Sequence, residues 1–230
     1  MVEATQVAEE TIAVPVAETA VEVPFDDYMA RYAADFYELA QGALIKMSPV
    51  SSTHDRILRY LALLFEAYLE LTQNGEIRIA PFVMRLPGVN SGREPDLQVI
   101  LKTNSGELTE TYQNGPADLC IEVVSPESVK RDHGEKFEEY ERGGVPEYWI
   151  VDPLHNECRF YRLGETAVEI VENEPPVKMY VRAEQDAEGL YRTPALPGLV
   201  LHVPTLWQPR LPGPAAVVEA VRGMVNVGKQ

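Results

Sequence analysis

The stretch ADLCIEVVSPESVKRDHGEKFEEYERGGVPEYWIVDP, from Ala117 to Pro153, decides the fold of this chain. It predicts a strand, a turn, a helix from about Val129 to Arg142 and a second strand at Glu147 to Val151. The first strand, Leu119 to Val124, is apolar at every position except Glu122, which is typical of a strand buried on both faces. A carboxylate in such a strand costs several kcal/mol unless it is paired, protonated or bound to a cation. Glu122 is therefore the first candidate for a functional residue.

A second acid opens another apolar strand upstream. Asp96 begins the run from Asp96 to Leu101, in which almost every other residue is apolar. If the two strands are antiparallel neighbours, Asp96 and Glu122 lie a few ångströms apart, where they either share a proton or hold a divalent cation. Mg²⁺ is the natural choice for such oxygen ligands, and it can polarise a phosphoryl oxygen and supply a hydroxide-like nucleophile.

The predicted helix after Glu122 supplies a cation. Asp132, Lys136 and Tyr140 are spaced by four residues and share one face of that helix. A lysine that points back toward Glu122 would orient an attacking water or offset charge in a transition state. The alternative is solvated pairing of Lys136 with Asp132 or Glu139, and spacing alone favours this for any single charge on the helix. The position of Lys136 just after the buried acid is what favours a functional role.

Length and composition restrict the class of protein. A chain of 230 residues can fill one good core, so we expect one domain, and 45% hydrophobic with 24% charged residues is typical of a soluble globular protein. No apolar run approaches the roughly 20 residues that span a bilayer, so we expect no membrane association. Cys120 and Cys158 lack metal-ligand spacing, and with an N-terminus unlike a secretory signal they predict a cytoplasmic protein. The net charge of −16 argues against a broad electrostatic grip on nucleic acid.

The rest of the chain reads as an α/β protein. We expect a disordered tail over residues 1–24, with a docked edge strand as the alternative. The segments expected before the central stretch are a short helix to about Ala33, a hairpin over Phe36 to Met47, a helix over Thr53 to Thr72, a strand over Glu76 to Leu86, and loops over Pro87 to Gly92 and Lys102 to Pro116. After it, short strands are expected at Cys158–Leu163, Val168–Val171, Val177–Val181 and Leu199–Val203, with a tail or short docked helix over 208–230.

Several of these segments together resemble the Uma family, which is assigned to the endonucleases of the PD-(D/E)XK superfamily. The resemblance covers about Phe25 to Trp207, and its central block is specific. It rests on Glu94–Asp96, Ile121–Pro126, Glu135–Tyr140 and Gly144–Pro153, with further likeness in Tyr37–Leu39, Gly42–Ile45, the turn Ser51–Asp55 and Pro197–Leu199.

The resemblance implies a restriction-endonuclease-like core over 25–207: a central mixed β-sheet flanked by helices, with an antiparallel C-terminal extension. It implies Asp96 and Glu122 as metal ligands and Glu38 as a supporting acid. We expect the carbonyl of Val123 to hold the ion together with the two carboxylates. In the usual E-X-K pattern the lysine would stand at position 124, which here is Val124, and Lys136 matches the family's displaced lysine.

Two further residues are candidates for supporting roles. His54, at a helix start, either contacts phosphate or caps and packs, and Tyr140 is a core or supporting hydroxyl rather than a catalyst.

The predicted function is Mg²⁺-dependent hydrolysis of phosphodiester bonds in DNA, with Mn²⁺ as a substitute ion. One alternative is a non-catalytic module for protein or homodimer contacts on the same fold, and another is a small-phosphoester hydrolase. A basic rim around the site would favour DNA, a small closed pocket would favour the phosphoester, and a blocked site would favour the module. The residues expected in a basic rim are Arg56, Arg59, Arg93, Lys130 and Arg131.

Overall fold

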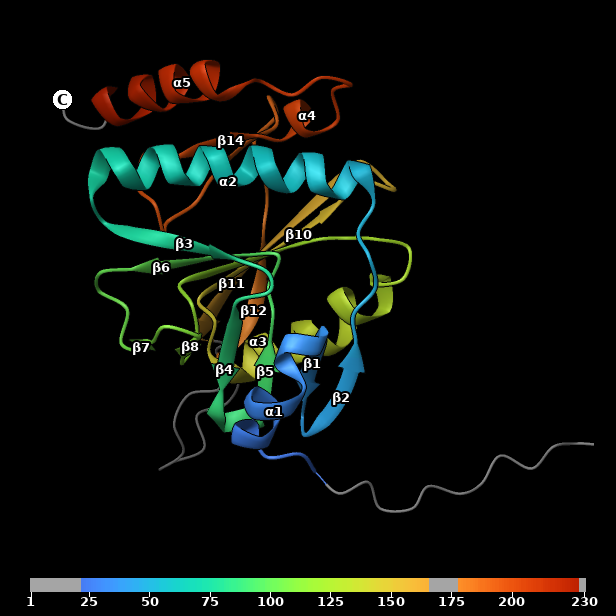
Figure 1. Cartoon of the computed structure of the whole chain (residues 1–230). Coiled ribbons are helices and arrows are strands. Elements are labelled where there is room, and N and C mark those ends of the chain that lie inside the picture. Colours follow the sequence, from blue (N-terminus) through green and yellow to red (C-terminus); the bar gives the residue numbers. More distant parts are fainter. Residues whose placement is uncertain (1–21, 166–177, 228–230) are drawn as a thin grey trace, which may run out of the picture.

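The computed structural model describes residues 22–165 and 178–227 (Figure 1). The helices are α1 (Phe25–Arg31), α2 (Ser52–Thr72), α3 (Lys136–Gly143), α4 (Val203–Leu206) and α5 (Pro214–Val227). Short 3-10 turns occupy Ala33–Asp35 and Pro87–Val89, and a π-helical turn at Arg131–Glu135 leads directly into α3. Within the described ranges, none of the helices is both long enough and apolar enough to cross a bilayer.

A mixed sheet forms the centre of the protein. Its strands lie in the order β12 (Lys178–Ala183), β11 (Glu157–Glu165), β10 (Glu147–Asp152), β9 (Leu119–Val123), β6 (Leu97–Leu101) and β3 (Gly75–Ile79). Strands β9 and β10 are parallel and the other neighbours are antiparallel. The parallel pair is joined by the π-helical turn and α3, as a crossover between parallel strands requires.

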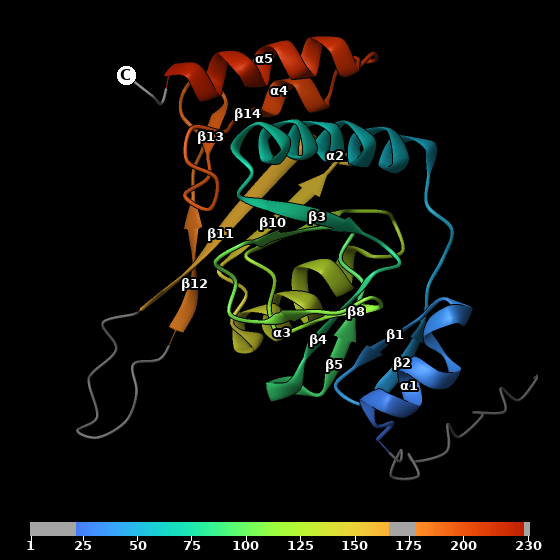
Figure 2. The ribbon, with the colours of Figure 1, turned by 60° about the vertical axis from the view of Figure 1, so that its left-hand side comes forward.

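A second sheet lies next to α3, and Figure 2 shows its strands β4 and β5 beside and below that helix. Its order is β2 (Ala43–Lys46), β1 (Tyr37–Ala40), β5 (Ser91–Arg93), β4 (Val83–Leu86), β8 (Tyr112–Asn114) and β7 (Glu107–Leu108). A small antiparallel pair, β13 (Leu190–Arg192) and β14 (Val200–His202), completes the C-terminal region. The predicted hairpin over Phe36 to Met47 is present as β1 and β2.

Alternation along β9 gives the central sheet two different faces. Leu119, Ile121 and Val123 belong to the core that includes α2, whereas Cys120 belongs to the core that includes α3. Glu122 has the parity of Cys120 and therefore faces α3. Figure 1 shows α2 and α5 on one side of this sheet and α3 on the other, so the predicted α/β class with a helix-flanked mixed sheet is confirmed.

The register between β6 and β9 places the two strand acids together. Leu97 pairs with Ile121, so one step further along the antiparallel register Asp96 stands opposite Glu122. Asp96 directly precedes β6 rather than lying inside it. The sequence-based expectation that antiparallel strands would bring these acids together is therefore confirmed at the level of the backbone.

Three predicted elements were wrong. The single strand over Glu76 to Leu86 is two strands, because the chain turns at Ala80–Phe82, and β3 and β4 belong to different sheets. Pro81 cannot donate to a strand ladder, which is a physical reason for the break. The loop over Pro87 to Gly92 contains the start of β5, and the loop over Lys102 to Pro116 contains β7 and β8. These short polar strands exist through pairing with distant partners, which local sequence does not reveal.

The C-terminal region packs against α2 and is hydrogen-bonded to the central sheet. Helix α5 packs along α2 and buries Val217 and Val221, which favours the docked helix over the free tail for this segment. Glu147 at the start of β10 accepts hydrogen bonds from Tyr191 Oη at 2.7 Å and Thr193 Oγ1 at 2.6 Å. Strand β13 was not predicted, and Val203 begins α4 instead of ending a strand.

Other predicted segments lie at the edge of the described ranges. Strand β12 includes most of the predicted strand at Val177 to Val181. The strand predicted at Val168 to Val171 and residues 1–21 of the predicted tail lie outside the described residues. Within the last residues of that tail, Val23 donates a backbone hydrogen bond to Gly42 of the β1–β2 turn at 2.9 Å.

Candidate active site

Asp96 is held at the mouth of the central sheet by two contacts. The backbone N–H of Val123 donates to Asp96 Oδ2 at 2.7 Å, and the ring Nε2 of His54 lies 2.9 Å from the same oxygen. His54 is placed by the start of α2, where the Ser51 hydroxyl accepts from the backbone N–H of His54 at 3.2 Å as an N-cap. Asp96 keeps 16% of its side chain exposed, so this acid is accessible from solvent.

Glu122 is buried against two side chains of α3. Its Oε1 atom accepts hydrogen bonds from Lys136 Nζ at 2.9 Å and from Tyr140 Oη at 2.7 Å. Lys136 and Tyr140 are four residues apart, so one face of α3 presents both to Glu122. All three residues are at most 2% exposed. Lys136 therefore pairs with the strand acid and not with Asp132 or Glu139 through solvated helix contacts.

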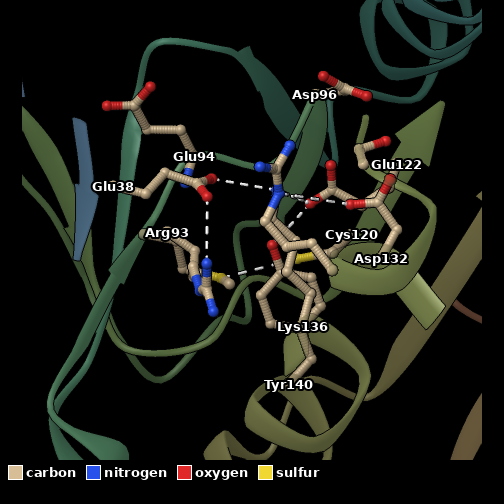
Figure 3. Close-up of polar contacts among 12 residues, drawn as sticks. Glu38, Arg93, Glu94, Asp96, Cys120, Glu122, Asp132, Lys136 and Tyr140 are labelled. Carbon is tan, nitrogen blue, oxygen red and sulfur yellow. Dashed lines mark hydrogen bonds and ion pairs between the residues drawn. The ribbon is translucent and has the colours of Figure 1, made fainter. Parts of the chain in front are cut away.

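Glu38 on β1 lies on the other side of the same lysine (Figure 3). Its Oε1 atom is 3.1 Å from Lys136 Nζ and accepts the backbone N–H of Glu94 at 2.9 Å. Its Oε2 atom accepts from Arg93 Nη1 at 3.2 Å. Arg93 also makes a two-pronged contact to Glu139 of α3, at 2.8 and 2.6 Å. A fully buried charge network thus joins the β1–β2 hairpin, β5 and α3 to Glu122.

Burial and neighbouring charge act in opposite directions on these groups. Burial raises the pKa of Glu122 to about 8, although the ammonium of Lys136 opposes the rise. Burial alone would lower the pKa of Lys136, but Glu122, Glu38 and other nearby carboxylates raise it above its usual value. Lys136 is therefore a fixed cation at neutral pH. For Glu38 burial would raise the pKa, but Lys136 and Arg93 lower it, so Glu38 is ionised.

Two acids at the site, Glu94 and Asp132, were not proposed as site residues from the sequence. Glu94 is buried, and burial and nearby Glu38 raise its pKa to about 7 against a hydrogen bond from Tyr28. Asp132 lies on the π-helical turn, is 2% exposed and has its Oδ1 atom buried without a hydrogen-bond partner. Burial raises the pKa of Asp132. Arg131 Nε stands 4.0 Å from Asp132 Oδ1, too far for a hydrogen bond. The sequence signal that could have identified Asp132 as a site residue was its spacing by four from Lys136. For Glu94 the only such signal was its position two residues before Asp96.

These groups line one small cleft between the start of α2, the end of β9 and the helix after it. The side chains around it include His54, Asp96, Glu122, Ser128, Arg131, Asp132 and Lys136. The five basic residues expected as a rim do not gather there. Arg93 is fully buried, and Arg56 donates to the backbone carbonyls of Gln208 and Pro209. Of those five, only Arg131 lines the cleft.

The donor set in the cleft fits a hard divalent cation. Among the described residues, no three His, Cys, Asp or Glu side chains converge as a ready-made metal site. Mg²⁺, however, is usually bound through one or two carboxylates and keeps several waters, so Asp96 and Glu122 on facing strands meet its minimum. The buried, unpartnered oxygen of Asp132 in the same cleft is an acceptor that a cation or its bound water would satisfy.

The comparisons with known proteins concern the family of the chain and its fold. The profile of the Uma2 family, described as "Putative restriction endonuclease", matches residues 25–204. The fold is similar to that of a crystal structure titled as a putative nuclease belonging to DUF820 from Anabaena variabilis. That likeness has a TM-score of 0.62 and 14% sequence identity, and it covers 80% of this chain and 97% of that chain. No curated protein matches the sequence. The match over 25–204 confirms the resemblance seen in the sequence: the chain belongs to the Uma2 family of putative restriction endonucleases.

Proposed function

We propose that this protein is a divalent-metal-dependent nuclease that hydrolyses phosphodiester bonds in DNA, with Mg²⁺ as its ion and Mn²⁺ as a substitute. The observation that carries the proposal is the juxtaposition of Asp96, Glu122 and the buried cation Lys136 at one end of the central sheet. Membership of the Uma2 family supports nuclease chemistry. A cytoplasmic location belongs to the same proposal and is supported by the two free cysteines, Cys120 and Cys158.

Asp96, Glu122 and the carbonyl of Val123 would hold the ion, and the free oxygen of Asp132 would bind the ion or one of its waters. When bound, such an ion polarises a phosphoryl oxygen and lowers the pKa of bound water. The backbone N–H of Val123 and the ring of His54 both contact Asp96 Oδ2, so they fix the orientation of that carboxylate. Both contacts use Oδ2, so the other carboxylate oxygen of Asp96 would be available to the ion.

Lys136 would act as a positioned cation. Hydrolysis of a phosphodiester builds negative charge on the phosphoryl oxygens, and a preorganised ammonium in a water-poor site stabilises that charge. Glu38 holds Lys136 from behind at 3.1 Å, so the ammonium stays in place beside Glu122. The raised pKa of Lys136 excludes a role as a neutral general base near pH 7. Lys136 would therefore orient the attacking water without accepting its proton, and a bound ion would make that water more acidic.

Two other functions each have an observation in their favour. The cleft around Asp96 and Glu122 is narrow and carries only Arg131 of the expected basic rim, which favours a small phosphoester. A non-catalytic or homodimer module is favoured by Val124 at the usual lysine position and by the net charge of −16. Both candidates predict no cleavage of DNA, so one assay separates them from the main proposal.

The assay incubates the purified protein with supercoiled plasmid, linear duplex and single-stranded DNA in Mg²⁺ or Mn²⁺. The proposal expects cleavage that falls at least about 100-fold in Asp96→Asn and Glu122→Gln proteins, as removal of a group that stabilises the transition state does. Glu66 is an exposed acid on α2, so the Glu66→Gln protein is the matched control and should cleave DNA normally. Cleavage that survives either site substitution contradicts the proposal, and hydrolysis of p-nitrophenyl phosphate alone would favour the small-phosphoester enzyme.

A further inference from the structure

An apolar groove opens next to the candidate active site. Its lining includes Phe36, Met47, Pro49, Val50, Ala80 and Pro81, and its volume is about 600 Å³. Phe36 is 61% exposed and Val50 is 57% exposed, which is unusual for large hydrophobic side chains. Ile79, 47% exposed, directly precedes Ala80 at the same end of β3. Contiguous exposed apolar surface of this kind marks a binding site more often than chance.

The backbone at Phe36 also departs from ordinary geometry. Phe36 has φ of +60°, in the left-handed region that bulky residues rarely adopt. The strand pairing of the hairpin continues through it, because the backbone N–H of Met47 donates to the carbonyl of Phe36 at 2.8 Å. The structure therefore holds an aromatic ring in solvent at the cost of an unfavourable backbone conformation. Such outliers concentrate at ligand-binding sites.

The groove is continuous with the cleft that contains the acids. Asp96 and Val50 line both, and Glu94 lies in the groove wall. Lys46, whose ammonium also lies over the ring of Tyr37, is the basic side chain among the lining residues. A ligand that places a phosphate at Asp96 can thus extend an apolar, planar group toward Phe36.

We infer that this groove takes one unpaired nucleobase of the strand that is cut, stacked on Phe36 and flanked by Val50 and Pro81. The substrate class would then be DNA with an unpaired nucleotide beside the scissile phosphate, such as a single strand or a flap. This inference rests on the proposed function. Bases within a duplex are stacked on their neighbours and cannot enter such a groove unless they are first extruded.

The charge of the protein supports this occupant. The net charge of −16 argues against a broad electrostatic grip on the phosphates of DNA. Stacking on an aromatic side chain is independent of that charge and tolerates any base sequence. A groove of about 600 Å³ is also within the usual range for pockets that take small organic groups.

The test measures binding separately from cleavage. A single-stranded oligonucleotide with 2-aminopurine and its matched duplex are titrated with the full-length protein in Ca²⁺, following anisotropy and 2-aminopurine emission. The inference expects the single strand to bind at least about tenfold more tightly than the duplex, with quenched emission. Phe36→Ala should weaken single-strand binding about tenfold, Phe36→Trp should preserve it, and Leu154→Ala, another exposed apolar side chain, should have no effect.

Equal affinity for the two forms of DNA, or full binding by Phe36→Ala, would overturn the inference. The same would follow if Phe36→Ala converted a dimer to a monomer in sedimentation, because the groove would then cover a second copy. Cleavage assays in Mg²⁺ keep the two proposals apart. If duplex is cut as fast as single strand and Phe36→Ala is fully active, the groove assignment fails while the nuclease assignment stands. If neither DNA is cut by the folded protein, the proposed function itself fails.

Discussion

Lys136 Nζ lies 2.9 Å from Glu122 Oε1, although the two residues belong to a helix and a strand that are separated by a turn. The parity of β9 explains the contact, because Glu122 points to the face of the sheet that α3 covers. A lysine that enters from α3 therefore reaches the same acid that a lysine at position 124 would approach along the strand. The departure from E-X-K leaves the pairing of the acid with a cation unchanged.

Replacement of Lys136 by methionine should reduce both stability and cleavage. Glu38 and Glu122 are each at most 2% exposed and both contact this ammonium. Its loss leaves the buried Glu122 carboxylate without a cationic partner and leaves Glu38 with Arg93 alone. Breaking a buried pair in this way costs about 3–5 kcal/mol of unfolding free energy. Urea denaturation measures that loss, and cleavage by the protein that remains folded should fall at least about 100-fold.

The matched control is Lys130→Met, which removes an exposed ammonium six residues earlier. Its stability should change by no more than about 0.5 kcal/mol. If Lys136→Met were as stable as Lys130→Met, the buried network would not have the energetic role assigned to it.

A lysine returned to position 124 should partly replace Lys136. Val124 is 1% exposed and two residues after Glu122, so both side chains point to the α3 face. The double variant Val124→Lys, Lys136→Met should recover part of the cleavage lost in Lys136→Met. It should also be less stable than wild type, because the lysine stem enters a filled apolar cluster. Single-turnover cleavage of the three proteins decides this, and no gain from the added lysine would contradict the equivalence of the two positions.

Arg93 should be essential for stability rather than for contact with DNA. It is fully buried and is held by Glu139 through two hydrogen bonds and by Glu38 through one. Arg93→Met should cost about 3–5 kcal/mol, whereas Arg93→Met combined with Glu139→Leu should recover at least about 1 kcal/mol of that loss. Denaturation of the two variants measures the coupling. Additive losses would show that Arg93 and Glu139 act independently.

The turn after β10 should contribute stability that depends on pH. Burial would raise the pKa of Asp152, but hydrogen bonds from His155 and from the backbone N–H groups of Leu154 and His155 lower it. A carboxyl with a lowered pKa stabilises the folded state above its unfolded pKa of about 3.9, and the effect disappears as pH falls through the folded pKa. Wild type should exceed Asp152→Asn by about 1 kcal/mol at pH 7 and by nothing near pH 2. A constant difference across that range would contradict this assignment.

Part of the site could be predicted because its residues violate a local pattern. Glu122 stands out in an apolar strand, and Asp96 stands at the start of another, so both acids are visible without a structure. Their proximity needed only the assumption of antiparallel neighbours, which the register Leu97–Ile121 bears out. The spacing of Lys136 allowed either solvated pairing on the helix or a functional role beside Glu122. The family resemblance favoured the functional role.

The rest of the site depends on a layer that local sequence does not reveal. Arg93, Glu139 and Glu94 look like ordinary exposed charges, yet the second sheet covers α3 and buries them. That sheet is built from short strands such as β5 and β8, whose pairing links distant segments. One signal was available: α3 has only Phe137 and Tyr140 as large hydrophobic residues, so a buried face of this helix had to include charged groups.

Isothermal titration of Mn²⁺ and Mg²⁺ into wild type and the Asp96→Ala, Glu122→Ala double variant tests whether these two acids bind the ion. We expect binding to the wild type and none to the double variant, with the fold of both confirmed by circular dichroism. Glu66→Ala serves as the control for loss of an exposed acid and should bind like the wild type. Equal binding by wild type and the double variant would show that the ion is held elsewhere. That result would contradict the assignment of Asp96 and Glu122 as the metal-binding pair.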